Sequence, residues 1–274
     1  MEIRQFYQQL AYFQEKFGIL AEQYDGTLHP STELETIIDE YSTFVTREDY
    51  RKIWIEAVHQ APLELLHKIE KLRSSSALCV EIMEKYRALK LLKGASERTD
   101  YFHNIEACIE KEFGSFHVTA DSKVVMVGSG SFPMTPLLIA KRTGARVTGI
   151  DIDEEAIELG RRVIDRLGDG LDITLEQVTL EQLAATRDAT HIIFSSTIPN
   201  KYELLDQLHP ITQEQVVVAM RYGDQLKSLF NYPMREVDEH KWRLVQNVIQ
   251  PSHVFDIALY QHAVSQADNL RRSE

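Results

Sequence analysis

The stretch VVMVGSGSFPMTPLL, residues 124–138 of this 274-residue sequence, has the composition of a ligand-binding turn. An apolar run leads into Gly128 and Gly130, which tolerate positive φ and let the backbone approach a ligand closely. Pro133 stands where a dinucleotide-binding turn has its third glycine, which brings the helix N-terminus to a pyrophosphate. The pattern therefore predicts a ligand without a pyrophosphate. The residues expected to hold it are Gly128, Ser129, Gly130 and Pro133.

Two carboxylates follow the next predicted strand, in ARVTGIDID. Asp151 and Asp153 lie about 20 residues beyond the glycine turn, where a carboxylate accepts hydrogen bonds from ribose hydroxyls. Asp151 is the stronger candidate because it directly follows the apolar strand, and Ile152 completes the candidate group. The combination predicts an adenosine-containing cofactor. The alternative is a turn and a solvated acidic strand end with no ligand.

Hydroxyl side chains follow the fourth predicted strand, in HIIFSSTIPNKY. Ser195, Ser196 and Thr197 are candidate cofactor-binding residues, because open α/β sheets bind ligands at the carboxyl ends of their strands. The same residues could instead cap the next helix, and both roles stay open. An Asn/Asp-Pro-Pro-aromatic motif, common in enzymes that methylate planar nitrogens, is absent here, since Pro199 stands alone.

An arginine ends the fifth predicted strand, in AMRYGDQLKSLFNYP. The guanidinium of Arg221 suits a ligand carboxylate, and a salt bridge with Asp224 or another surface acid is an equal alternative. The candidate substrate-binding residues are Arg221, Tyr222, Asp224, Asn231 and Tyr232.

Helical spacing of apolar residues dominates the chain up to about residue 118. In STELETIIDEYSTFV, one stripe contains Leu34, Ile37, Ile38, Tyr41 and Val45. The segments around 50–60, 62–73, 76–93 and 100–113 show the same periodicity. We expect an N-terminal helical domain over residues 1–118.

From Lys123 onward, short β-branched runs alternate with helical segments, which predicts an α/β domain with a parallel sheet over residues 119–274. Thr135 and Pro136 are the expected N-cap and first-turn residues of the helix after the glycine turn, and Gly144 its end. The last two strand-like runs have no helix between them and predict an antiparallel hairpin at the sheet edge.

Composition excludes several classes of protein. The 30 Lys and Arg against 42 Asp and Glu give a formal charge of −12, which repels nucleic acids and anionic membranes. The N-terminus does not have the pattern of a signal peptide, and no segment approaches membrane-span length. Cys79 and Cys108 lack a C-x-x-C spacing, which favours reduced thiols in the cytoplasm. The histidines lack metal-binding spacing, so we expect no metal.

Several longer motifs point to a known family. The stretches MVGSGSFPMT, GIDIDEEAIELGRRV, THIIFSSTIP, VVVAMRYGD, FNYP and YFHNIE resemble the nicotianamine synthase-like family, most of all its bacterial histidine 2-aminobutanoyltransferases of staphylopine-type opine metallophore synthesis. The glycine loop resembles that of class I methyltransferase-like proteins. The resemblance implies a Rossmann-like class I methyltransferase-type sheet with an N-terminal helical domain. It also implies S-adenosylmethionine as co-substrate, with Thr179 and Leu180 near the adenine.

The resemblance also implies a reaction other than methyl transfer. The amine of a histidine, D or L, would attack the γ-carbon of the methionine moiety, and 5′-methylthioadenosine would leave. All three carbons on the sulfonium are activated alike, so positioning decides which one reacts. The product would pass to an opine dehydrogenase, and any metal would bind the finished product. A further hypothesis is that the protein forms a homodimer.

An amine nucleophile must be neutral, so a base is expected. Glu84, in ALCVEIMEKYRALKLL, has small and apolar helical neighbours and Glu81 beside it, which should raise its pKa. A solvated pair with Arg87 is the alternative, and the resemblance favours the catalytic role. It also implies a role for Tyr101 in closing the site, although Tyr101, Ile105 and Cys108 could form a core stripe. The candidate catalytic residues are Glu84, Tyr101 and Glu81.

Ile105 stands where plant and archaeal family members have a tyrosine, which favours a single transfer over repeated condensation. Two other functions keep the same fold. The first is small-molecule methyl transfer, supported by the glycine loop alone. The second is a non-catalytic sensor of S-adenosylmethionine or methylthioadenosine that reports through the helical domain.

Overall fold

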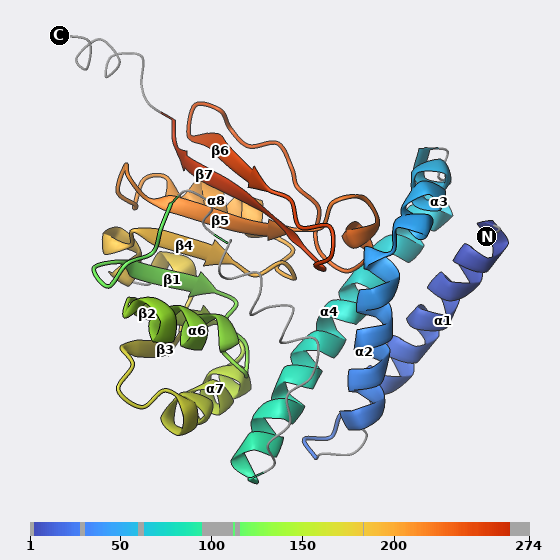
Figure 1. The fold of residues 1–274 in the computed structure, drawn as a ribbon, viewed down its shortest axis with the longest axis horizontal. Helices are drawn as coiled ribbons and strands as arrows, with labels where there is room; N and C mark the ends of the chain where they lie inside the picture. Colours follow the sequence, from blue (N-terminus) through green and yellow to red (C-terminus); the bar gives the residue numbers. More distant parts are fainter. Residues whose placement is uncertain are drawn as a thin grey trace.

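The computed structural model describes residues 3–27, 31–59, 63–94, 112, 116–182 and 184–263. In this part of the chain, a layer of long helices lies beside a twisted seven-stranded sheet that carries its own helices (Figure 1). The predicted helix over residues 100–113 falls almost wholly outside the described residues. The domain boundary at residue 118 therefore stays a prediction.

Four helices form the N-terminal layer: α1 (Ile3–Glu22), α2 (Ser31–Thr46), α3 (Glu48–His59) and α4 (Leu63–Leu92). Aromatic rings fill the space between α1 and α2, with Phe13 and Tyr41 at 4.8 Å and Phe17 and Tyr41 at 5.0 Å between ring centroids. The predicted stripe from Leu34 to Val45 is buried in this core, which confirms it. The 30-residue helix α4 runs along the sheet domain and contacts helix α7 (Glu154–Leu167) and the 3₁₀ helix η3 (Gln225–Leu229).

The sheet has the strand order β3-β2-β1-β4-β5-β7-β6. The parallel strands are β1 (Lys123–Val127), β2 (Arg146–Asp151), β3 (Ile173–Gln177), β4 (His191–Phe194) and β5 (Val217–Tyr222). The antiparallel strands are β6 (Trp242–Val248) and β7 (Asp256–His262). This confirms the predicted parallel sheet and the hairpin at its edge, in which β7 pairs with β5 and β6 lies outermost.

Helices between the strands are α6 (Met134–Thr143), α7 (Glu154–Leu167) and α8 (Lys201–Leu208), with short 3₁₀ helices η1 (Leu180–Gln182), η2 (Ala184–Asp188) and η3 (Gln225–Leu229). Alternate residues of β1 point to opposite faces. Val124 and Met126 join the core that continues into the N-terminal helices, and Val125 and Val127 join the core under α8. The N-terminal helices and the α6 face of the sheet therefore share one apolar core. None of the described helices is long and apolar enough to cross a membrane.

The start of α6 differs from the prediction. The helix begins at Met134, with Pro133 at the N-cap and no side-chain capping bond, so Thr135 is not the cap. The Thr135 hydroxyl instead accepts a hydrogen bond from Arg221. Gly144 ends the helix in the left-handed conformation, with φ of 74°, as the sequence predicts.

Candidate active site

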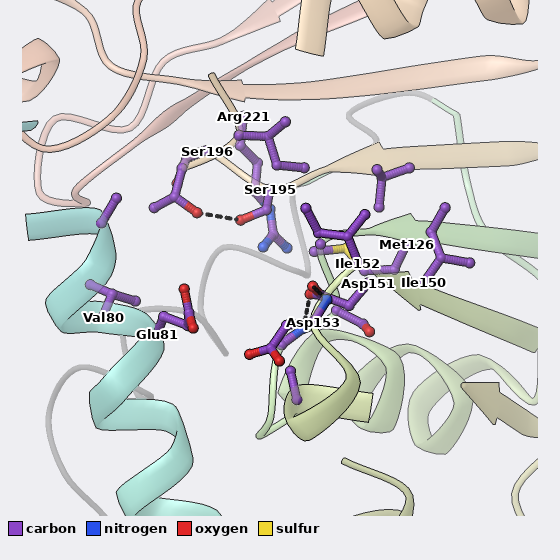
Figure 2. Close-up of a pocket in the computed structure, with 18 of the residues that line it drawn as sticks. Val80, Glu81, Met126, Ile150, Asp151, Ile152, Asp153, Ser195, Ser196 and Arg221 are labelled. Atoms are coloured by element: carbon purple, nitrogen blue, oxygen red, sulfur yellow. Dashed lines mark hydrogen bonds between the residues drawn. The ribbon is translucent and has the colours of Figure 1, made fainter. Parts of the chain in front are cut away.

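A cavity of about 770 Å³ lies where the carboxyl ends of the parallel strands face helix α4. The point where the strand order reverses, between β1 and β4, is the usual ligand crevice of an open α/β sheet. Figure 2 shows α4 on one side, with Val80 and Glu81, and the strand ends opposite. Predicted site residues in the lining are Glu81, Glu84, Gly128, Ser129, Gly130, Asp151, Ile152, Asp153, Thr179, Leu180, Ser195, Ser196, Thr197, Arg221 and Tyr232.

The glycine turn is held by the end of β2. The backbone N–H groups of Gly128 and Ser129 donate to the carbonyl of Ile150, at 2.9 and 3.0 Å. The Gly130 N–H donates to Oδ2 of Asp151 at 3.0 Å, and the Asp153 N–H donates to Oδ1 at 3.1 Å. Each Asp151 oxygen keeps a second lone pair for a ligand hydroxyl. Asp151 therefore shapes the turn and faces the cavity at once.

Pro133 is absent from the cavity lining among the described residues. Its ring lies near Gly160 of α7: a Cβ added to Gly160 would lie 3.7 Å from the Pro133 Cδ. The proline therefore contributes to helix packing behind the turn. The turn itself uses positive φ at Gly128 (75°) and Gly130 (68°).

Glu84 projects from α4 onto the glycine turn. A Cβ added to Gly130 would lie 2.0 Å from Glu84 Oε2, so only a glycine at position 130 leaves room for this carboxylate. Burial, together with the charges of Asp151 and Glu81, raises the pKa of Glu84 to about 8 against the opposing effects of Arg87 and the Ser131 backbone. A carboxyl group with such a pKa can exchange a proton near neutral pH.

Lys85 follows Glu84 on α4 and is buried among three carboxylates. The sequence did not predict these contacts. The Lys85 Nζ lies 3.1 Å from Glu81 Oε1, 2.6 Å from Asp153 Oδ2 and 2.9 Å from Glu155 Oε2. The Tyr24 hydroxyl donates to the second Glu155 oxygen at 2.9 Å. The i,i+4 spacing of Glu81 and Lys85 was the only local signal for this cluster. We call the residues Glu81, Glu84, Asp151 and Asp153 the acidic wall of the cavity.

The opposite wall carries hydroxyl groups. Ser195 Oγ and Thr197 Oγ1 are 3.2 Å apart and hydrogen-bonded. Helix α8 begins at Lys201 with Asn200 at its N-cap and no side-chain capping bond, so the Ser-Ser-Thr run does not cap it. Ser195 and Ser196 face the cavity across from Asp151 and Asp153 (Figure 2). We call Ser195, Ser196, Thr197, Arg221 and Tyr232 the β4–β5 wall.

Arg221 lines the cavity but has a carboxylate partner within the protein. Its Nε donates to Glu112 Oε1 at 2.5 Å, and its Nη2 donates to Glu112 Oε2 at 2.7 Å and to Thr135 Oγ1 at 3.0 Å. Both side chains are buried, at 5% and 0% exposure. Among the described residues, the carboxylate that pairs with Arg221 is therefore neither Asp224 nor a surface acid, the alternative that the sequence left open, but a buried residue 109 positions away in the sequence.

Three other predicted residues are not in the described lining. The Tyr222 hydroxyl donates to Asn247 Oδ1 at 3.0 Å, and Asn231 Nδ2 donates to the Val254 carbonyl at 2.7 Å. Asp224 is the N-cap residue of η3. Tyr101 lies outside the described residues. In the described part of the chain, no group of three or more His, Cys, Asp or Glu could hold a metal ion, and the metal-free site stays a prediction.

This combination of sheet, glycine turn, acidic strand end and covering helices defines a methyltransferase-like fold of the nicotianamine synthase type. A crystal structure of MtNAS in complex with MTA and tNA superposes with a TM-score of 0.74, at 15% identity, over 94% of this chain and 98% of that chain. A glutamate-to-glutamine variant of MtNAS in complex with S-adenosylmethionine gives 0.69, at 16% identity, over 92% and 98%.

Sequence comparison is more specific. An L-histidine 2-aminobutanoyltransferase of Pseudomonas aeruginosa is 29% identical over 194 residues, which are 70% of this chain and 73% of that protein. One of Yersinia pestis is 30% identical over 202 residues, 69% of this chain and 75% of that protein. The chain belongs to the L-histidine 2-aminobutanoyltransferase family. Models of known protein families give no match.

Proposed function

We propose that this protein transfers the 2-aminobutanoyl group of S-adenosylmethionine to the amine of histidine and releases 5′-methylthioadenosine. The observation that carries the proposal is Glu84, a carboxyl group with a pKa raised to about 8 that lies against the glycine turn inside the cavity. A base at this place is what an amine nucleophile needs, because the amine must be neutral to attack.

The acidic wall would receive the adenosyl part of the co-substrate. Asp151 presents free lone pairs at the end of β2 for the ribose hydroxyls, and Ile152 is 82% exposed beside it for the adenine face. Val178, Thr179 and Leu180 follow β3, the neighbour of β2, and also line the cavity. Helix α4 would then lie over the methionine moiety, where Glu84 would face the histidine nitrogen that attacks the reacting carbon.

The bond changes follow from this arrangement. The histidine nitrogen forms a bond to the γ-carbon, the carbon–sulfur bond breaks, and its electron pair leaves with the neutral thioether. Positive charge therefore moves from sulfur to nitrogen, and the nitrogen passes its extra proton to Glu84. A carboxylate at the nitrogen would also stabilise the charge that develops there. The sulfonium charge also lowers the pKa of Glu84 on binding, which prepares the carboxylate form.

The acceptor is proposed to be L-histidine, because the relatives carry that substrate in their names. The product retains a primary amine on its aminobutanoyl arm, which suits reductive condensation with a 2-oxo acid by an opine dehydrogenase in metallophore synthesis. A reducing cytoplasm agrees with the buried free thiol of Cys79. A homodimer also stays a proposal, to be tested by light scattering of the purified protein.

The product assay tests the function. Purified protein is incubated with S-adenosylmethionine and either L-histidine, D-histidine or alanine, and the products are identified by mass spectrometry. Methylthioadenosine and aminobutanoyl-histidine are expected with L-histidine. S-adenosylhomocysteine would instead identify a methyltransferase. Calorimetric binding of S-adenosylmethionine without product from any amine would identify a sensor.

A further inference from the structure

Lys201 is a completely buried lysine, with 0% exposure, at the first position of α8. Its ammonium donates hydrogen bonds to three backbone carbonyls: Ser196 at 3.3 Å, Arg221 at 2.5 Å and Tyr232 at 3.2 Å. In the described part of the chain, no carboxylate forms an ion pair with Lys201. Three separate segments therefore meet at one amine.

The three segments form the β4–β5 wall. Ser196 follows β4, Arg221 belongs to β5, and Tyr232 follows η3, and all three residues line the cavity. The Tyr232 N–H donates to the Ser196 carbonyl at 3.2 Å, and the Gly223 N–H donates to the Tyr232 carbonyl at 3.2 Å. Lys201 completes this network from behind the wall, since its own side chain is absent from the described lining.

This placement of a lysine is unfavourable for stability. Burying a cation without a carboxylate partner is unfavourable, and the positive end of a helix dipole adds to that cost. Burial lowers the pKa of Lys201 to about 7, which reflects the cost of the charge. An apolar side chain would avoid the buried charge but would remove the shared donor of the three carbonyls. An ammonium, however, has three donors for three carbonyls, and it fixes their separation.

A second buried lysine shows the ordinary arrangement. Lys227 Nζ lies 2.8 Å from Asp256 Oδ1 and 2.8 Å from the Gln250 carbonyl, so its charge has a partner. None of Lys227, Gln250 and Asp256 is in the described cavity lining. Lys227 is therefore a matched control for the loss of a buried lysine.

We propose that Lys201 is a positioning residue that holds the β4–β5 wall in the geometry needed to present the histidine acceptor to the sulfonium carbon. The proposal rests on the proposed function. Lys201 contacts no residue of the acidic wall in the hydrogen bonds of the described residues, so its role is confined to the acceptor side. Binding of the adenosyl part does not depend on it.

The test compares Lys201→Met with Lys227→Met. For each variant, kcat and KM for histidine, calorimetric Kd for methylthioadenosine and folded fraction are measured. Lys201→Met is expected to lower kcat/KM for histidine by about 30-fold or more, because misplacement by about 1 Å costs on the order of 100-fold. The methylthioadenosine Kd should change by less than about twofold. Lys227→Met should keep kcat/KM within about threefold after correction for folded protein.

If Lys201→Met does not fold, Lys201→Gln, which keeps two N–H donors, replaces it in the test. We again expect a lower kcat/KM for histidine and a nearly unchanged Kd for methylthioadenosine. Equal losses in the Lys201 and Lys227 variants, or a parallel loss of methylthioadenosine binding, would overturn the positioning role. A wild-type protein that makes no methylthioadenosine from any amine overturns the proposed function itself. The wild-type assay therefore separates the two failures.

Discussion

Each wall of the cavity has a buried lysine behind it, and the two lysines have different partners. Lys85 lies among the carboxylates of Glu81, Asp153 and Glu155, whereas Lys201 lies among three backbone carbonyls. The acidic wall is thus organised by side-chain charge, and the β4–β5 wall by backbone hydrogen bonds. We expect the first wall to respond to pH and to charge-changing substitutions, and the second to respond to changes of shape.

This difference between side-chain charge and backbone hydrogen bonds agrees with the proposed role of each wall. The acidic wall would bind a cationic co-substrate and manage one proton, and both tasks depend on electrostatic potential. The β4–β5 wall would hold the acceptor at one distance from one carbon, and that task depends on rigid geometry. Glu84 belongs to the acidic wall but differs from its neighbours, because among the described residues Lys85 forms ion pairs with Glu81 and Asp153 and not with Glu84.

The largest effect is expected for Glu84→Gln, which removes the base and keeps the shape. Turnover should fall about 10³-fold, while the methylthioadenosine Kd stays within about threefold. Glu64→Gln, on the exposed first turn of the same helix, is the control and should change neither turnover nor Kd. Steady-state kinetics and calorimetry provide both measurements. Turnover retained within tenfold would remove Glu84 from the mechanism and leave the acidic wall as a binding surface only.

The same substitution should stabilise the protein. Because the pKa of Glu84 is raised to about 8, the folded state binds more protons than the unfolded state between the ordinary glutamate pKa and 8. The free energy of unfolding therefore falls as pH rises through that window. A neutral glutamine avoids this loss, and we expect about 2 kcal/mol more stability at pH 7 than in the wild type. Thermal unfolding at pH 5 and pH 7 would show a gain only at the higher pH.

Gly130→Ala tests whether shape matters on the acidic wall as well. The added Cβ would meet Glu84 Oε2 at 2.0 Å and must displace it, so turnover should fall about 10²-fold. Gly144→Ala is the matched control: its φ of 74° is similar to the 68° of Gly130, and its Cβ would meet only Ala120, at 3.5 Å or more. Both variants should lose about 1 kcal/mol of stability. Equal activity in the two would mean that Glu84 tolerates displacement.

The sequence predicts the elements around the site better than the contacts within it. The glycine turn, Asp151 and Glu84 were found because each has a local signal, a strand end or a helical face. The partners of Arg221, Lys85 and Lys201 were not found, because a buried charge is satisfied by residues far away in the chain. Glu112 and Arg221 are 109 positions apart, and the carbonyls around Lys201 belong to segments up to 31 positions away. Backbone acceptors in particular cannot be predicted from residue types, because every residue has a carbonyl group.

The smallest effect is expected for Glu81→Gln, and it separates the two carboxylates of α4. The charge of Glu81 raises the pKa of Glu84, so removing it should lower that pKa and move the acidic limb of the kcat/KM profile to lower pH. The shift should be only a few tenths of a pH unit, because the Glu81 side chain is 46% exposed and already paired with Lys85. Turnover above the limb should stay within about threefold. If Glu81 were the base, turnover would instead be lost and the acidic limb of the kcat/KM profile would be absent. The catalytic roles within the acidic wall would then have to be reassigned to the residues that pair with Lys85.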